Sequence, residues 1–304
     1  LNFFILSTFY FFIRGFQDKS NKNIPYYFAY VCMGIGFMIK GPIAIIIPAL
    51  VIGGFLITLR NWEELSRLRL GYGTMILAAV ILPWFVTMLV IHGNEFKSHI
   101  LGAELRDRMI HDTPFSLYYF GVIIRYYLPW SFFFLAALAV WFLPTLTQPI
   151  SSPSTKSYFL FLSEKLKVWH GNITHKDNQA FLFSIMWIVC PLILFTLFRI
   201  EHSRYMLPVS VPITMITAQF LSQFTDSPNG FQGSTFKVLF YLALTFYLSI
   251  FTLTAMGILF LFPHFSAPTG LIALSVLSLF GVVLLPILYK LKKYFYLIIA
   301  LSIV

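Results

Sequence analysis

Hydrophobic residues form long runs along this chain, and short polar segments separate them. About ten of these runs are long enough to enter or cross about 30 Å of hydrocarbon as helices. They lie near residues 1–13, 24–39, 42–59, 72–91, 118–143, 180–198, 205–224, 238–262, 269–289 and 294–304. The pattern predicts an all-α fold: a polytopic membrane helix bundle of about ten spans.

The composition excludes a soluble domain. Of the 304 residues, 59% are hydrophobic and only 11% are charged, whereas soluble domains carry about 25% charged residues. The aromatic content of 19% suits aromatic belts at both membrane interfaces. A net charge of +10 could indicate nucleic-acid binding, but the basic residues lie in short loops between apolar runs. We therefore predict membrane lipids and no nucleic acid as partners.

The basic residues predict an orientation, because Lys and Arg are enriched in cytoplasmic loops. Alternate loops carry 14 of the 21 basic residues, and the loops between them carry the other seven. Acidic residues divide almost equally between the two sets. The basic-rich loops, which include 60–70, 145–178 and 290–293, are predicted to be cytoplasmic. The loop 92–117 and the turns 40–42 and 199–204 are predicted to be external.

The polar segments also suggest how the chain is organised. We expect residues 1–304 to form one transmembrane domain of a longer protein, since apolar runs reach both ends of the sequence. The external loop 92–117 has apolar residues at helical spacing, which predicts an amphipathic helix over 94–110 in the membrane interface. Residues 145–178 are rich in Ser, Thr and Pro, which is typical of a flexible linker.

The external loop offers candidate functional residues on its polar side: Glu104, Arg108 and His111. Its three histidines and four carboxylates leave divalent-metal binding open. No tight ligand spacing is present, however, and structural metal sites usually show one. A solvated face with local ion pairs, such as Glu104 with Arg108 four residues on, is the simpler interpretation. We predict no metal site.

Lys40 lies at a helix break on the predicted external side. Gly41 permits unusual backbone torsions and Pro42 lacks an N–H, so Lys40-Gly41-Pro42 should end one helix and start another. A lysine there either snorkels to lipid headgroups or meets an anionic group of a ligand.

The turn before the next apolar run on that side carries Arg204 and Tyr205. Arg offers a planar fork that suits phosphate, and Tyr offers a hydroxyl. The alternative is interfacial anchoring, which is common for both residue types. Lys40, Arg204 and Tyr205 together are predicted to form a cationic site for one anion.

Several motifs in order resemble the polyprenyl-phosphate-sugar glycosyltransferases, a group with protein O-mannosyltransferases and the lipid A aminoarabinose transferase. The matching region runs from about 36 to 212. The motifs are Gly36-Phe37-Met38-Ile39-Lys40-Gly41-Pro42, Leu82-Pro83-Trp84, His111-x-x-Pro114-Phe115 with Tyr118-Tyr119, Leu128-Pro129-Trp130, and Arg204-Tyr205-Met206-Leu207-Pro208.

The resemblance implies a GT-C-type membrane enzyme. Such enzymes move a sugar from a polyprenyl-phosphate carrier to lipid A, another glycolipid or a protein on the external side, here the periplasmic side of a bacterial inner membrane. By position, Lys40 and Tyr205 match residues that line the carrier-phosphate site. The family's catalytic Asp precedes the matching region, so the catalytic residue is unknown here and we expect the fragment alone to be inactive. The family's metal-binding His is replaced by Leu105, so no cofactor is certain and a divalent metal stays the alternative.

A transporter or flippase for an anionic lipid or solute is the alternative function, because broken helices with charged residues are also typical of transporters. Transporters usually show two related halves with charges near mid-membrane. In this sequence the candidate charges gather on one external side and no internal repeat is evident, which favours the transferase over the transporter. A purely structural subunit would not need Lys40 and Arg204 on the same side.

The predicted orientation can be tested by labelling single cysteines from outside intact cells, after replacement of Cys32 and Cys190. A cysteine at position 99 should react with a membrane-impermeant maleimide, because its loop is external. A cysteine at position 165 should react only after the cells are opened. The reverse pattern would overturn the orientation.

Overall fold

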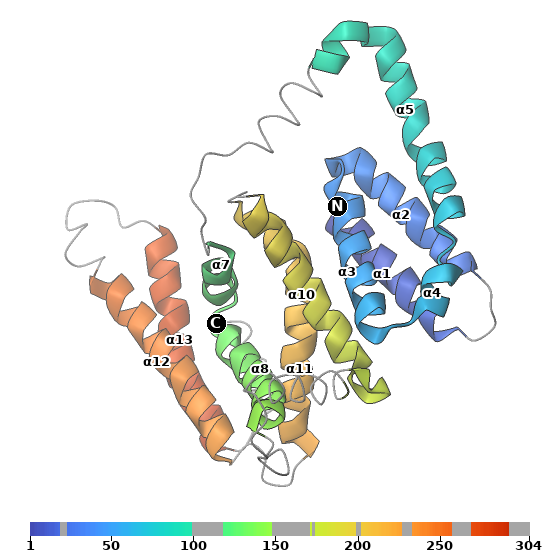
Figure 1. Ribbon diagram of the computed structural model, residues 1–304. Coiled ribbons are helices and arrows are strands. Elements are labelled where there is room, and N and C mark those ends of the chain that lie inside the picture. Colours follow the sequence, from blue (N-terminus) through green and yellow to red (C-terminus); the bar gives the residue numbers. More distant parts are fainter. Residues whose placement is uncertain are drawn as a thin grey trace, which may run out of the picture. The chain divides into compact units, whose positions relative to one another are not determined.

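The computed structural model describes residues 1–18, 23–98, 118–147, 171, 174–198, 202–226, 233–256 and 269–291. All regular elements in these ranges are helices (Figure 1). The chain divides into two compact units. The first comprises Leu1–Ile124 and Phe142–Ile216, and the second comprises Arg125–Trp141 and Thr217–Val304.

The helices follow the predicted apolar runs closely. In chain order they are α1 Asn2–Gln17, α2 Ile24–Lys40, α3 Ile43–Leu59, α4 Trp62–Arg67, α5 Leu70–Ser98, α7 Tyr118–Tyr126, α8 Trp130–Thr147, η2 Lys176–Asn178, α10 Gln179–Leu197, η3 Ser203–Val209, α11 Ser210–Asp226, α12 Ser234–Met256 and α13 Thr269–Lys290.

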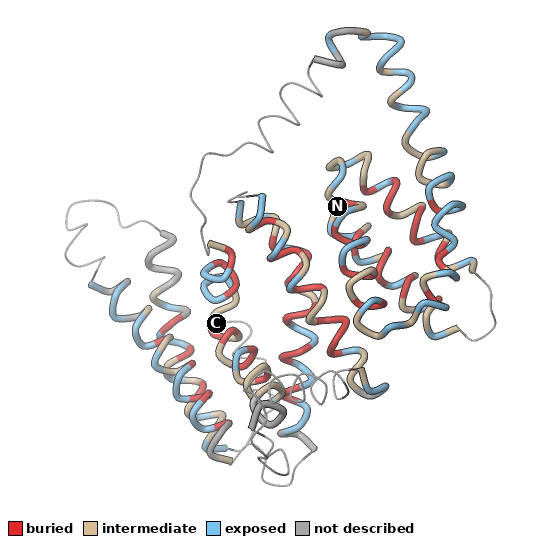
Figure 2. The backbone as a smooth tube through the Cα atoms, in the orientation of Figure 1, coloured by how far each residue is buried: buried red, intermediate tan, exposed pale blue. Residues whose placement is uncertain are grey.

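An aromatic core holds the first unit together. The ring of Phe183 on α10 lies 5.8 Å from Phe12 on α1 and 5.3 Å from Phe55 on α3. Trp187, one turn along α10, lies 4.3 Å from Phe9. Such ring pairs contribute about 0.5–1.5 kcal/mol each beyond their buried area. Buried positions recur along all four helices of this core, α1, α2, α3 and α10 (red in Figure 2).

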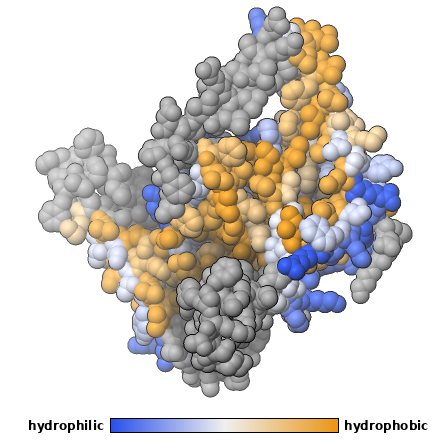
Figure 3. All heavy atoms as spheres, viewed as in Figure 1, coloured by the Kyte–Doolittle hydropathy of each residue, from blue (hydrophilic) through white to orange (hydrophobic). Residues whose placement is uncertain are grey.

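Two glycines let α2 and α5 approach closely. A Cβ added at Gly73 of α5 would meet the ring of Tyr30 on α2, and one added at Gly34 would lie 3.0 Å from Val80. Small residues at helix contacts are typical of membrane bundles, because they let backbones pack tightly without a hydrophobic driving force. The remaining faces of α5 are apolar and exposed (pale blue in Figure 2, orange in Figure 3), as suits contact with lipid.

Stacked aromatic rings also hold α12 and α13 of the second unit. Tyr289 on α13 stacks on Phe240 of α12, with ring centres 4.7 Å apart and planes at 17°. Phe236, one turn earlier on α12, lies 6.4 Å from Tyr289 and 6.2 Å from Phe133 of α8. Phe236 and Phe240 are almost fully buried.

The structure confirms the all-α membrane fold. Among the described residues, three helical stretches are long and apolar enough to cross a membrane: Trp62–Gly93, Gln179–Leu197 and Ser203–Gln223. A fourth results if α7 and α8 form one broken span, and shorter apolar helices include Ile24–Lys40 and Ile43–Leu59. The total of ten spans stays a prediction, and the predicted run 294–304 lies outside the described residues.

The structure corrects two of the predicted runs. The run 118–143 is broken at residues 127–129 into α7 and α8, where Pro129 cannot donate a backbone hydrogen bond. The run 205–224 begins as the 3₁₀ helix η3. The helix α5 extends to Ser98 with a break at Gly93, whose φ is 50°; the break lies next to the predicted start of the external loop at 92, and the loop itself stays a prediction.

Two predicted segments are only partly described. Of the amphipathic helix predicted over 94–110, only 94–98 is described, and it is helical. Of the predicted linker 145–178, residues 145–147 belong to α8 and residues 176–178 form η2. Residues 171, 174 and 175 are described as well, but the rest of both segments lies outside the described residues, so both assignments stay predictions.

A buried carboxylate fastens α4 to the ends of α1 and α2. Glu64 is 6% exposed; it accepts a hydrogen bond from the Tyr26 hydroxyl and one of 2.9 Å from Arg67. Arg67 also donates to the Asp18 carbonyl oxygen at 3.2 Å. The Asn61 side chain caps α4 by accepting from the Glu64 N–H at 3.1 Å. The position of this short helix therefore depends on one carboxylate.

Replacing Glu64 by Gln should destabilise the protein, because the partly buried Arg67 loses its counter-charge. We expect the free energy of unfolding to fall by about 1–3 kcal/mol. The measurement is the unfolding of detergent-solubilised protein by denaturant. Glu63→Gln is the matched control: Glu63 is exposed, and its replacement should change the value by less than about 0.5 kcal/mol. Equal effects of the two substitutions would contradict the role given to Glu64.

Candidate functional site

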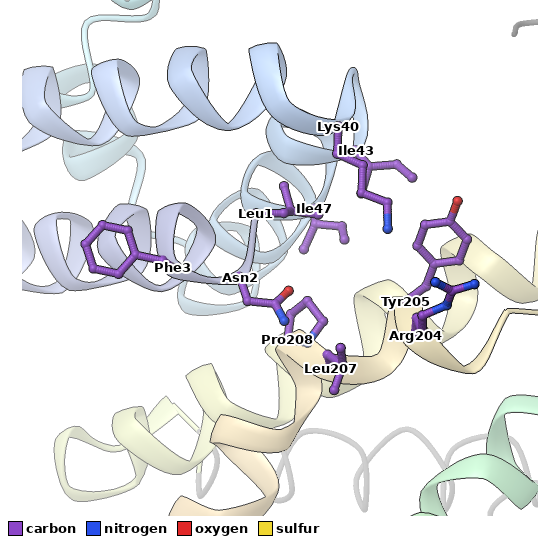
Figure 4. A pocket seen from close by; sticks show the side chains of 10 residues that line it. All are labelled: Leu1, Asn2, Phe3, Lys40, Ile43, Ile47, Arg204, Tyr205, Leu207 and Pro208. Atoms are coloured by element: carbon purple, nitrogen blue, oxygen red, sulfur yellow. The ribbon is translucent and has the colours of Figure 1, made fainter.

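A cavity of about 360 Å³ lies in the first unit, where the start of α1, the break between α2 and α3, and η3 meet. Ligand pockets typically hold about 300–1,000 Å³. Its wall is apolar with a few polar groups (Figure 4). The lining residues are Leu1, Asn2, Phe3, Lys40, Ile43, Ile47, Arg204, Tyr205, Leu207 and Pro208.

The backbone of Gly41 positions Lys40. Gly41 has φ 74° and ψ −154° and donates its N–H to the Phe37 carbonyl oxygen at 2.7 Å, which ends α2. That combination of torsions is essentially restricted to glycine. Pro42 then starts α3, so the chain reverses within two residues. Lys40 is thus the last residue of α2 and its side chain points into the cavity (Figure 4).

Tyr205 forms a platform beneath the Lys40 ammonium. The Lys40 Nζ lies 4.4 Å from the centre of the Tyr205 ring, within the distance of a cation–π interaction. Phe195 of α10 also supports Tyr205: the two rings are stacked, with centres 5.1 Å apart and planes at 26°. The His202 ring lies 5.7 Å away. Tyr205 is therefore held by rings from two elements.

Arg204 brings a second cation to the same cavity. Its side chain is exposed, and its guanidinium lies beside Tyr205 (Figure 4). The described lining holds Lys40 and Arg204 and no carboxylate. Ile43, Ile47, Leu207 and Pro208 supply an apolar wall next to these charges. The arrangement suits an anion that carries a hydrocarbon substituent.

The structure thus brings together the three residues of the predicted cationic site, Lys40, Arg204 and Tyr205. That this cavity binds a carrier phosphate stays a prediction. The loop candidates Glu104, Arg108 and His111 lie outside the described residues. Within the described ranges no group of three or more His, Cys, Asp or Glu side chains could hold a metal ion; metal binding by the loop remains untested.

Several residues of this site were not predicted from the sequence. Asn2 lines the cavity. The only feature of the sequence that could have indicated this role is that Asn2 is polar and lies at the start of an apolar run. Phe195 supports Tyr205 from another helix. Nothing distinguishes Phe195 in a sequence so rich in phenylalanine, because ring stacking between distant segments leaves no local pattern.

Comparisons with known proteins agree with this fold. The family model for dolichyl-phosphate-mannose-protein mannosyltransferase matches residues 1–88. An undecaprenyl phosphate-alpha-4-amino-4-deoxy-L-arabinose arabinosyl transferase of Pseudomonas aeruginosa (strain UCBPP-PA14) is 26% identical over 201 residues, 62% of this chain and 29% of that protein. Its counterpart from Pseudomonas paraeruginosa is 28% identical over 193 residues, again 62% of this chain and 29% of the relative.

The structural comparison covers nearly the whole chain. The crystal structure of ArnT from Cupriavidus metallidurans bound to undecaprenyl phosphate superimposes with a TM-score of 0.64 at 16% identity, over 94% of this chain and 48% of ArnT. The chain spans 29% of the length of each of the two Pseudomonas enzymes. These findings confirm the resemblance seen in the motifs: the chain has the GT-C membrane fold and is similar in sequence to glycosyltransferases that use lipid-phosphate sugar donors.

Proposed function

We propose that this chain is part of a membrane glycosyltransferase that moves a sugar from a polyprenyl-phosphate carrier to an acceptor on the external side. The observation that supports this function most directly is the cavity, because both Lys40 and Arg204 line it beside an apolar wall. A polyprenyl phosphate combines an anionic head with a hydrocarbon chain, so it matches both parts of the lining. The acceptor is lipid A, another glycolipid or a protein.

The proposed reaction is a direct displacement at the anomeric carbon of the sugar. A carboxylate removes the proton of the acceptor hydroxyl or amine, and the freed electron pair forms the new bond to that carbon. The bond between the anomeric carbon and the phosphate oxygen breaks, and the polyprenyl phosphate leaves with its electron pair. Lys40 and Arg204 stabilise the negative charge on the leaving phosphate. The carboxylate is not assigned to a residue of this chain.

We place the enzyme in a bacterial plasma (inner) membrane with the cavity on the periplasmic side. The distribution of Lys and Arg among the loops supports this orientation, since Lys40 and Arg204 belong to the predicted external turns. The bacterial sources of the similar transferases support the membrane.

Replacing Lys40 by Ala should weaken binding of undecaprenyl phosphate. A charge-assisted contact to phosphate is worth about 1.5–3 kcal/mol, which corresponds to roughly a ten- to hundredfold higher Kd. Native mass spectrometry of the purified protein with undecaprenyl phosphate measures this change. Lys40→Arg should recover part of the affinity, because it keeps the charge.

Lys237→Ala is the matched control, since Lys237 is an exposed lysine near the start of α12. It should leave the Kd unchanged. If Lys40→Ala binds undecaprenyl phosphate as tightly as the parent protein, Lys40 only anchors its helix at the interface and the proposed site is wrong.

Lys40 and Arg204 should act on the same phosphate, which a double-mutant cycle can test. If both contact one phosphate, the effects of Lys40→Ala and Arg204→Ala on the free energy of binding should differ from additivity by about 0.5–3 kcal/mol in the double variant. The measurement is again the Kd for undecaprenyl phosphate. Strictly additive effects would indicate that the two cations serve separate ligands.

A further inference from the structure

We propose that Tyr119 is a positioning residue for the carrier-phosphate site. It holds the backbone of the turn that carries Arg204, and it supports the Tyr205 ring that lies under the Lys40 ammonium. This inference rests on the proposed function, because it concerns how that same site is shaped. Tyr119 lies on α7 and does not line the cavity. Its effect on a phosphate therefore passes through other residues.

The hydroxyl of Tyr119 fastens the backbone of His202. Tyr119 is 1% exposed. Its hydroxyl accepts a hydrogen bond from the His202 N–H at 3.2 Å and lies 3.5 Å from the His202 carbonyl oxygen. A buried side chain of α7 thus contacts both backbone polar groups of one residue from a distant part of the sequence.

That residue begins the helix that carries the site. His202 is the N-cap of η3, and its own side chain makes no capping hydrogen bond. Its carbonyl oxygen accepts the N–H of Tyr205 at 3.0 Å, which closes the first turn of η3. Arg204 and Tyr205 belong to this turn. Moving His202 would therefore move both of them.

The ring of Tyr119 supports the same turn from the side. It lies 5.7 Å from the ring of Phe195, which stacks on Tyr205 at 5.1 Å. Tyr205 in turn lies under the Lys40 ammonium at 4.4 Å. A continuous series of contacts runs from α7 through α10 and η3 to the end of α2. Since binding geometry must be kept to within about 0.5 Å, such a support decides whether both cations reach one phosphate.

The test is Tyr119→Phe, which removes the hydroxyl and keeps the ring. We measure binding of two lipids by native mass spectrometry: undecaprenyl phosphate and the uncharged undecaprenol. The Kd for undecaprenyl phosphate should rise by about three- to tenfold, because the cations lose their alignment. The Kd for undecaprenol should stay unchanged, because the apolar wall is intact. A variant with a general structural defect would lose both lipids alike.

Tyr30→Phe is the matched control. Tyr30 is also buried, and its hydroxyl donates to the carbonyl oxygen of Leu68 at 3.1 Å, next to α4. Both variants should lower the thermal unfolding midpoint to a similar extent. Only Tyr119→Phe should reduce the preference for the phosphate over the alcohol.

Three outcomes would overturn the inference. In the first, Tyr119→Phe binds undecaprenyl phosphate with the Kd of the parent protein. In the second, its Kd for undecaprenol rises as much as its Kd for undecaprenyl phosphate. In the third, Tyr30→Phe loses the preference for the phosphate over the alcohol to the same extent. A different result identifies failure of the proposed function: the parent protein itself would then bind undecaprenyl phosphate no better than undecaprenol.

Discussion

The contact between the Lys40 ammonium and the Tyr205 ring is the interaction on which the candidate site depends. It joins the end of α2 to η3, two parts of the chain that are far apart in sequence. A cation over an aromatic face gains about 0.5–2 kcal/mol, which is enough to orient a side chain. The contact therefore helps to fix the position of the ammonium in the cavity.

Lys40 and Arg204 line the same cavity. Two like charges repel each other, and this repulsion grows as the local dielectric constant falls beside an apolar wall. A bound phosphate would remove the repulsion and add attraction to both charges. The proposed site would therefore favour an anion over a neutral lipid, although the hydrocarbon part of either could contact Ile43 and Ile47.

Local patterns in the sequence predicted the helices, the reversal at Gly41 and the three residues that meet in the cavity. These features have local causes: apolar runs set the helices, and glycine followed by proline sets the reversal. The break at residues 127–129 was missed because the apolar run continues through it. Phe195 was also missed, and Tyr119 was noted only as part of a motif, without its role as a support. Their roles depend on which distant helices pack together, and a chain with 35 phenylalanines and 16 tyrosines offers too many equivalent candidates.

The close fit between Gly73 and the Tyr30 ring has a consequence for motion. The Tyr30 ring occupies the space that a larger side chain at position 73 would need. Sliding of α5 along α2 would bring the larger neighbours of Gly73 against this ring, so the contact opposes that motion. The break at Gly93 lies further along α5, so a change in its backbone torsions would re-aim residues 94–98 and leave the contact between Gly73 and Tyr30 undisturbed.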